Sequence, residues 1–130
     1  MIDDNPELGG HALHSILPVV NCTNSALNGI PEYKAVKKLI EELAENTNLE
    51  VMVNTSVFGL YEDNLVAAQC DANLFKIRAE SVVLAPGATD RHLVFENNDR
   101  PGILLSSAIK KYADFFGVAC GEKNIIFTNN

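Results

Sequence analysis

The spacing of apolar residues predicts two amphipathic helices, at residues 31–45 and from about residue 104 to residue 116. In the first helix the apolar residues recur at intervals of three and four, so they share one face that we expect to pack on a core. They are Val36, Leu39, Ile40 and Leu43. Pro31 suits the first turn of this helix, because a helix leaves the amide hydrogen that proline lacks unpaired there. The second helix should end before Gly117, where a left-handed cap is expected.

Shorter apolar runs predict strands. One group lies at residues 49–53, 57–61, 65–69 and 75–79, with the polar residues 62–64 as a hairpin tip. This group predicts a small antiparallel β-meander. The continuous apolar run at residues 82–85 ends at Pro86-Gly87, which is typical of a strand buried on both faces. Residues 124–128 predict one further strand.

The candidate ligand-binding residues lie at two places in this pattern. The small turn Ala85-Pro86-Gly87-Ala88 follows the strand predicted at 82–85, and open α/β sheets bind ligands beyond the carboxyl ends of their strands. An ordinary junction between a strand and a loop explains this turn equally well. Asp3 precedes the glycine pair Gly9-Gly10 and is a candidate for binding ribose hydroxyls, with a solvated acid as the simpler alternative.

No metal site or catalytic group is predicted. His11 and His14 have the spacing of ligands on one helical face, yet no third His, Cys or carboxylate is placed to complete a site. The sequence also shows no proton-transfer dyad and no activated nucleophile. We therefore assign no catalytic residue in this chain.

Composition limits the classes of binding partner and the cellular compartment that we expect for this protein. The net charge of -7 and the pI of about 4.8 argue against binding to nucleic acid or to an anionic membrane surface, since both need a basic patch. No apolar run approaches the roughly 18 to 20 residues of a membrane span. Three cysteines, an odd number without a Cys-x-x-Cys pair, favour reduced thiols in a cytoplasmic protein.

Four motifs resemble the alpha subunit of heterotetrameric sarcosine oxidases. They are Asp-x-x-Pro-x-x-Gly-Gly at 3–10, VFGLYEDNLVAA at 57–68, LAPGATDRHLVFENNDRPGILL at 84–105 and GEKNIIFTNN at 121–130. The similarity covers nearly the whole chain. The segment Asn-Asp-Arg-Pro-Gly after a Leu-Ala-x-Gly-Ala turn is the most specific part, because Ala-x-Gly alone occurs in many flavin and nicotinamide enzymes.

The resemblance implies the fold and the cofactor site. The chain would be one partial α/β domain, a Rossmann-like FAD/NAD(P)-binding segment with an inserted antiparallel β-meander. Residues 1–48 would form a loop and a crossover helix, residues 49–80 the meander, and residues 81–130 a buried strand, a linker, a helix and the first strand of a second nucleotide-binding lobe. The implied cofactor is NAD or FAD. Asp3 would bind the adenosine ribose, Gly9 and Gly10 would lie beside the pyrophosphate, and Ala85, Gly87 and Ala88 would pack near the dinucleotide.

The resemblance also implies partners. Family members of this type demethylate sarcosine oxidatively to glycine, with other subunits of a hetero-oligomeric oxidase. The glycine-rich loop of the first strand would precede Met1 and the second lobe would continue past Asn130, so the isolated chain should not catalyse and should bind a dinucleotide weakly at best. Strand edges left bare would favour self-association. The alternatives are a non-catalytic interaction or folding module and a subunit of a related amine or imino-acid dehydrogenase.

Overall fold

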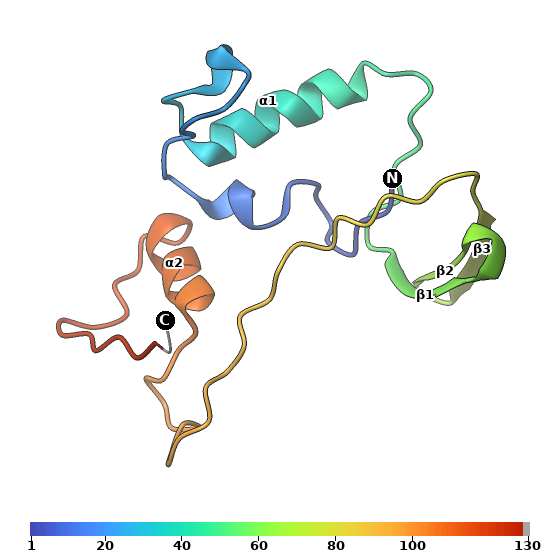
Figure 1. The fold of residues 1–130 in the computed structure, drawn as a ribbon. Coiled ribbons are helices and arrows are strands. Elements are labelled where there is room, and N and C mark those ends of the chain that lie inside the picture. Colours follow the sequence, from blue (N-terminus) through green and yellow to red (C-terminus); the bar gives the residue numbers. More distant parts are fainter. Residues whose placement is uncertain (129–130) are drawn as a thin grey trace.

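The structure is a computed structural model, and it describes residues 1–128. The chain forms an open arrangement in which α1 (Glu32–Ala44) lies above, a small β-sheet lies at one end and α2 (Ser106–Asp114) lies at the other (Figure 1). A long irregular segment, residues 79–105, connects the sheet to α2 and is called the connecting segment below. Both predicted helices and the predicted mixture of helix and strand are confirmed.

The start of α1 is fixed by backbone groups of the preceding loop. The N–H groups of Glu32 and Tyr33 donate to the carbonyl oxygens of Leu17 and Ser15 at 2.8 and 3.1 Å. These bonds satisfy two of the amide hydrogens that a helix start leaves unpaired. The loop predicted before the helix contains two short 3-10 helices, η1 (Gly10–His14) and η2 (Ser25–Leu27), and η1 packs against α1.

The first residues of the chain pair in parallel with the segment that follows α1. The N–H of Met52 donates to the carbonyl of Met1 and the N–H of Asp3 donates to the carbonyl of Met52, both at 2.9 Å, and Thr55 N–H donates to Asp3 at 2.9 Å. The alternation of residues 49–53 predicted that they belong to the antiparallel meander, and this prediction is wrong. They pair with residues 1–3 across the helix, because a connection through a helix returns the chain in the same direction.

The antiparallel meander is confirmed and comprises β1 (Ser56–Tyr61), β2 (Leu65–Cys70) and β3 (Asn73–Arg78), in that order. The hairpin between β1 and β2 turns at Asp63 and Asn64, which both have positive φ angles of 56° and 53°. Asp and Asn tolerate this backbone conformation better than most residues. The central strand β2 contains the best covered side chains of the sheet, with Ala68 fully buried.

The predicted strand at residues 82–85 is wrong for this structure. These residues are extended but join no sheet, and Val83 and Leu84 are 89% and 71% exposed. A buried parallel strand needs hydrogen-bonded neighbours on both edges and cover on both faces, and residues 1–128 supply neither here. The strand predicted at residues 124–128 is wrong for the same reason, since Ile125 is 99% exposed.

The connecting segment ends in consecutive turns. The amides of Asn98, Arg100 and Ile103 donate three residues back at 3.2 Å each. The ring of Phe95 contacts that of Phe127 edge-on at 5.5 Å, so the C-terminal segment lies against these turns. Gly117 has a φ of 63°, which confirms the left-handed residue predicted after the second helix. Asn129 and Asn130, which end the last motif, lie outside the described residues.

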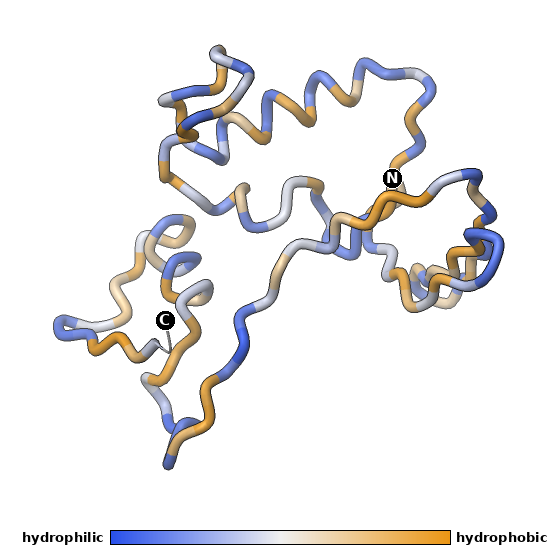
Figure 2. The backbone as a smooth tube through the Cα atoms, in the orientation of Figure 1, coloured by the Kyte–Doolittle hydropathy of each residue, from blue (hydrophilic) through white to orange (hydrophobic). Residues whose placement is uncertain are grey.

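The buried core is small. The chain exposes 10774 Å², whereas a compact monomer of its mass exposes about 6,700 Å². The buried apolar residues of the described chain are Leu27, Ala35, Val66, Ala67 and Ala68. The predicted stripe on α1 is only partly covered, since Leu39 and Leu43 remain 40% and 38% exposed. Apolar stretches occur along much of the chain (Figure 2), and many of their large side chains are exposed. No helix within residues 1–128 has the length and apolar character that crossing a membrane requires.

The uneven cover of the leucines leads to a stability prediction. Leu27 is 5% exposed, so Leu27→Ala should lower the free energy of unfolding by about 2–5 kcal/mol. Leu39→Ala should cost only about 1 kcal/mol, because water already reaches much of that side chain. Urea denaturation followed by circular dichroism measures both. Equal losses in the two variants would contradict the burial described here.

Candidate functional site

Asp3 lies in the parallel ladder and makes a local turn. Its Oδ1 accepts hydrogen bonds from the backbone N–H and the side-chain amide of Asn5, at 2.9 and 3.1 Å. The backbone of Asp3 is held on both sides by Met52 and Thr55. The carboxylate is therefore placed firmly at the end of the ladder, half-buried, and its second oxygen, Oδ2, is the atom that a ligand hydroxyl would reach.

The glycine pair divides into two different positions. Gly9 has a φ of 114°, and a side chain on it would meet Val36 of α1 at 2.5 Å, so this glycine lets the loop pack on the helix. Gly10 has a φ of 53°, and nothing lies within 4 Å of the space that a side chain would fill. Its backbone faces open space at the wall of a pocket. Of the two, Gly10 has the accessible backbone that a ligand requires.

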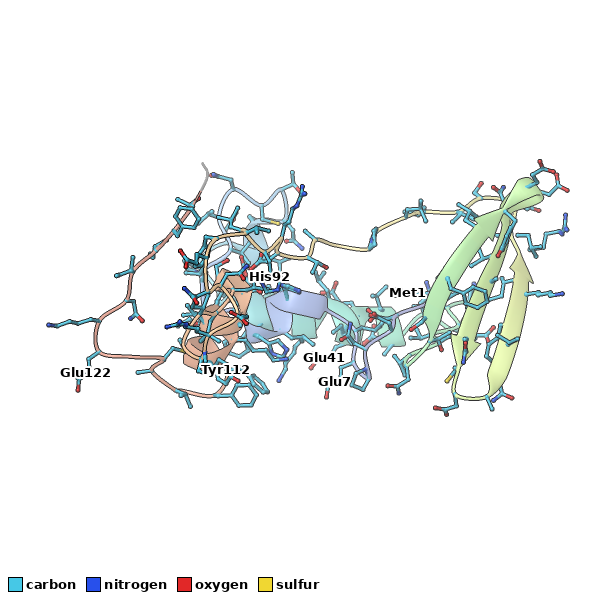
Figure 3. The ribbon with its side chains drawn as sticks, turned by 90° about the horizontal axis from the view of Figure 1, so that it is seen from below. Met1, Glu7, Glu41, His92, Tyr112 and Glu122 are labelled. Atoms are coloured by element: carbon cyan, nitrogen blue, oxygen red, sulfur yellow. The ribbon has the colours of Figure 1, made fainter. Side chains whose placement is uncertain are left out.

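The turn at residues 85–88 lies apart from these groups. Ala85, Gly87 and Ala88 are exposed, and Gly87 has a φ of 73° with open space around it. The connecting segment crosses the N-terminal residues in the view of Figure 1, but the perpendicular view in Figure 3 shows the two running apart. The structure therefore does not bring the turn together with Asp3, Gly9 and Gly10.

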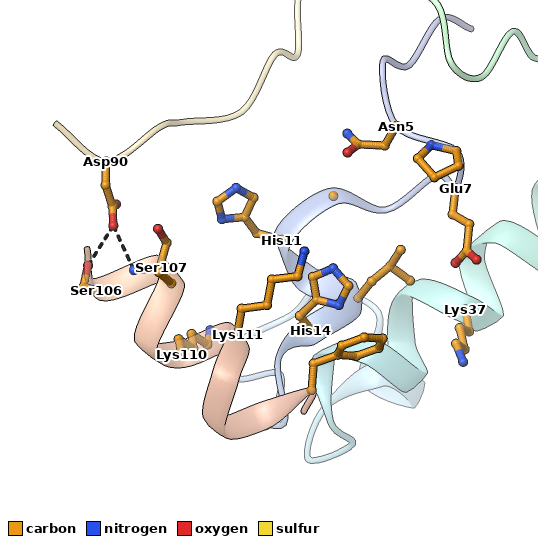
Figure 4. A pocket seen from close by; sticks show the side chains of 15 residues that line it. Asn5, Glu7, His11, His14, Lys37, Asp90, Ser106, Ser107, Lys110 and Lys111 are labelled. Carbon is orange, nitrogen blue, oxygen red and sulfur yellow. Dashed lines mark hydrogen bonds between the residues drawn. The ribbon is translucent and has the colours of Figure 1, made fainter. Parts of the chain in front are cut away.

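A pocket of about 800 Å³ lies between the N-terminal loop, α1 and α2 (Figure 4). Of the residues predicted from the sequence as a cofactor site, Gly10 alone lines the pocket. Asn5, the partner of Asp3, lines it too. Sequence reasoning missed the side chains that α1 and α2 contribute. These are Lys37 of α1, Ser106, Ser107, Lys110 and Lys111 of α2, and Phe115 directly after α2. These side chains line the pocket only because elements far apart in the chain pack together, and a local sequence pattern gives no information on that packing.

Asp90 closes one side of this pocket and caps α2. Its Oδ2 accepts the hydroxyl of Ser106 and the backbone N–H of Ser107, both at 2.9 Å. A carboxylate at a helix start is stabilised by the unpaired amides and by the helix dipole. The backbone N–H of Ser107 lowers the pKa of Asp90 most, and the hydroxyls of Ser107 and Ser106 lower it further. The density of polar residues after the turn was the only sequence signal for this contact.

His14 lies on the opposite wall against an aromatic ring. Its imidazole meets the ring of Phe115 at 4.6 Å in an edge-on arrangement, which links η1 to the end of α2. Burial lowers the pKa of His14 below its ordinary 6.5, and the charges of Lys111 and His11 lower it further, with Glu7 opposing them. The neutral form of His14 is therefore favoured in the folded chain.

The pocket is lined by groups that can contact phosphates and hydroxyls. Within residues 1–128 no three His, Cys, Asp or Glu side chains are grouped so that they could hold a metal ion. The pocket instead combines an open glycine backbone, serine hydroxyls and lysine amines, which are groups that contact phosphates and hydroxyls.

The parallel pairing across α1 and the inserted antiparallel sheet define the class of the protein, an α/β segment of Rossmann-like type. The chain is similar over 92% of its length to the solved structure of L-proline dehydrogenase from P. horikoshii, with a TM-score of 0.76 and 28% identity, and it covers 24% of that protein.

The resemblance to sarcosine oxidase alpha subunits is confirmed, because the whole chain aligns with one segment of such proteins. It is 33% identical to the sarcosine oxidase subunit alpha of Corynebacterium sp. strain U-96 and 30% identical to that of strain P-1, over 100% of this chain and 14% of each relative. It is also 36% identical to the subunit alpha of Rhizobium meliloti strain 1021, over 69% of this chain and 10% of that protein. No family model matches the chain.

The Asp90 cap leads to a pH prediction. A carboxyl group whose pKa is lowered on folding stabilises the folded state fully above its ordinary value of 3.8, and this contribution is lost as the pH falls through the lowered pKa. An NMR titration should therefore give a midpoint for Asp90 below 3.8. Ser106→Ala should move the midpoint upward and Ser56→Ala, on the remote sheet, should leave it unchanged. A midpoint at or above 3.8 in the unaltered chain would refute the cap.

Proposed function

We propose that this chain is the dinucleotide-binding segment of a sarcosine oxidase alpha-like subunit, a component of an oxidoreductase that demethylates sarcosine to glycine. One observation carries the proposal: the whole chain aligns at 33% identity with a sarcosine oxidase subunit alpha. The chain spans 14% of that relative, so substrate and partners belong to the proposal.

The residues present fit a dinucleotide in specific ways. Asp3 would accept the ribose hydroxyls through Oδ2, since Asn5 already occupies Oδ1. Gly10 would let the pyrophosphate approach its backbone, because the space beside it is open, and Gly9 would hold the loop on α1. Ala85, Gly87 and Ala88 lie apart from these three residues, so the fit rests on Asp3, Gly9 and Gly10. When bound, NAD or FAD would supply the hydride chemistry that these residues lack.

The exposed apolar surface supports a role within a larger assembly. The chain exposes well over the area of a compact monomer of the same mass, and its open residues include Val83, Ile125 and Ile126. Further domains and partner subunits of an oxidase would cover such surface. We further propose a cytoplasmic location, in keeping with the free thiols of Cys22, Cys70 and Cys120.

Two alternatives have an observation in their favour. The similarity to L-proline dehydrogenase, at a TM-score of 0.76, favours a subunit of an imino-acid dehydrogenase. The small core favours a non-catalytic interaction or folding module, because an open chain holds a ligand poorly.

A binding experiment tests the cofactor. Calorimetric titration of the chain with NAD and with FAD should show weak binding to one of them, lowered further by about tenfold or more in Asp3→Ala, because a carboxylate that accepts ribose hydroxyls makes charged hydrogen bonds. Asp4→Ala is the matched control, since Asp4 is the neighbouring acid and is exposed. Equal losses in both variants would exclude Asp3 as the ribose ligand, and the absence of binding to either dinucleotide would favour the non-catalytic module.

A substrate assay separates the two oxidoreductases. The complete protein, purified with its partner subunits, should reduce its electron acceptor with sarcosine and release glycine and a one-carbon unit. Rapid turnover of L-proline with no turnover of sarcosine would replace the proposal by the imino-acid dehydrogenase.

A further inference from the structure

The pocket between η1 and α2 is basic although the protein is acidic. The chain carries a net charge of -7, yet the cations that line this pocket outnumber its two carboxylates, Glu7 and Asp90. The cationic and titratable nitrogen groups are His11, His14, Lys37, Lys110 and Lys111. A surplus of one sign of charge in a cavity attracts ions of the opposite sign. The local charge is therefore opposite to that of the molecule.

The carboxylates do not neutralise these cations. Asp90 is engaged at the start of α2, where Ser106 and Ser107 donate to its Oδ2. Within residues 1–128 one ion pair forms, between Arg78 and Asp63 at 3.2 Å, and it lies on the sheet, so no lysine of the pocket is paired with an acid. The lysines are exposed and carry no acidic partner among the described residues, so an anion that enters the pocket would gain their attraction without first breaking an ion pair.

The arrangement of the side chains gives the anion a position. Lys111 extends from α2 toward the imidazoles of His11 and His14, which come from η1 (Figure 4). Phe115 fixes the ring of His14 on the other side, and Nδ1 of His14 is enclosed without a hydrogen-bond partner. The open backbone of Gly10 adjoins these groups in the same wall.

We propose that Lys111, His11 and His14 form an anion site that binds the phosphate groups of a pyrophosphate-containing ligand between η1 and α2. The site itself follows from the charges of the pocket. Its assignment to a dinucleotide pyrophosphate rests on the proposed function.

Binding at this site should be coupled to a proton. The groups that face His14 are Lys111 from α2, His11 from η1 and Glu7 from the preceding loop. Burial, Lys111 and His11 lower the pKa of His14, and Glu7 opposes them. An anion placed among them would raise that pKa, because a negative charge favours the protonated imidazole. Binding near neutral pH should therefore take up a proton, and affinity should increase as the pH falls from 8 to 6.

The experiment uses inorganic pyrophosphate as the probe. Calorimetric titration of the chain should show binding that weakens about tenfold in Lys111→Gln, since the variant loses a charge-assisted hydrogen bond. Lys76→Gln should bind as the unaltered chain does, because Lys76 is an exposed lysine of β3 at the opposite end of the molecule (Figure 1). Repeating the titration in two buffers of different ionisation enthalpy measures the proton uptake, which His14→Gln should abolish. Circular dichroism of each variant confirms that the helices are retained.

The outcomes separate this site from the proposed function. Pyrophosphate binding that depends on Lys111, together with NAD or FAD binding that is also weakened in Lys111→Gln, supports both. Dependence on Lys111 for pyrophosphate with no dinucleotide binding supports the anion site and counts against the proposed function. Dinucleotide binding that is unchanged in Lys111→Gln overturns the assignment of the site to a dinucleotide. A failure of the unaltered chain to bind pyrophosphate, or pyrophosphate binding that is unchanged in Lys111→Gln, overturns the anion site itself and leaves the proposed function to its own test.

Discussion

The parallel hydrogen bonds between residues 1–5 and residues 50–55 are the constraint on which the rest of the N-terminal half depends. Four backbone amides take part, from Asp3, Met52, Asn54 and Thr55, and the terminal ammonium of Met1 donates to Glu50 at 2.6 Å. At about 1 kcal/mol each, such bonds roughly match the cost of closing a loop of this length, which is about 3.5 kcal/mol beyond a constant term. Because the hydrogen bonds do little more than offset this cost, the pairing persists only with the further stabilisation from the packing of η1 on α1. It also positions Asp3, whose carboxylate holds Asn5 in the lining of the pocket, so the fold and the candidate site share one support.

The elements that the sequence predicted correctly are those whose stabilising partners are near in the chain. The two helices contain their own hydrogen bonds, and the meander pairs neighbouring strands through the short turns at Asp63-Asn64 and Asp71. The strand predicted at residues 82–85 depends instead on neighbours that residues 1–128 do not contain, although its apolar pattern is that of a buried strand. The apolar pattern thus indicates the buried environment that suits Val83 and Leu84. Because the segment pairs with no neighbouring strand, both side chains remain in water.

The candidate site divides in a similar way. Asp3 and the Gly9-Gly10 pair could be identified from sequence, because a short motif specifies an acid and a flexible turn within eight residues. Lys111 could not, since it reaches His11 and His14 only after α2 packs beside η1, about a hundred residues apart in the chain. The argument from net charge was limited in the same way, because net charge does not depend on how the chain folds. A net charge of -7 excludes a broad basic surface but says nothing of where the few lysines gather.

The position of Asp90 explains why this pocket can select its ligand. The start of a helix attracts any anion, but the amide of Ser107 and the hydroxyl of Ser106 are already satisfied by the carboxylate of Asp90. An incoming phosphate must therefore contact side chains further along α2, and Lys111 lies one turn beyond that start, facing the histidines of η1. The carboxylate of Asp90 thus occupies the start of α2 and keeps other anions from binding there. A phosphate is then recognised by groups that two separate elements contribute. A site of that kind forms only when η1 and α2 are held together, which makes the contact between His14 and Phe115 part of the binding machinery as well as of the fold.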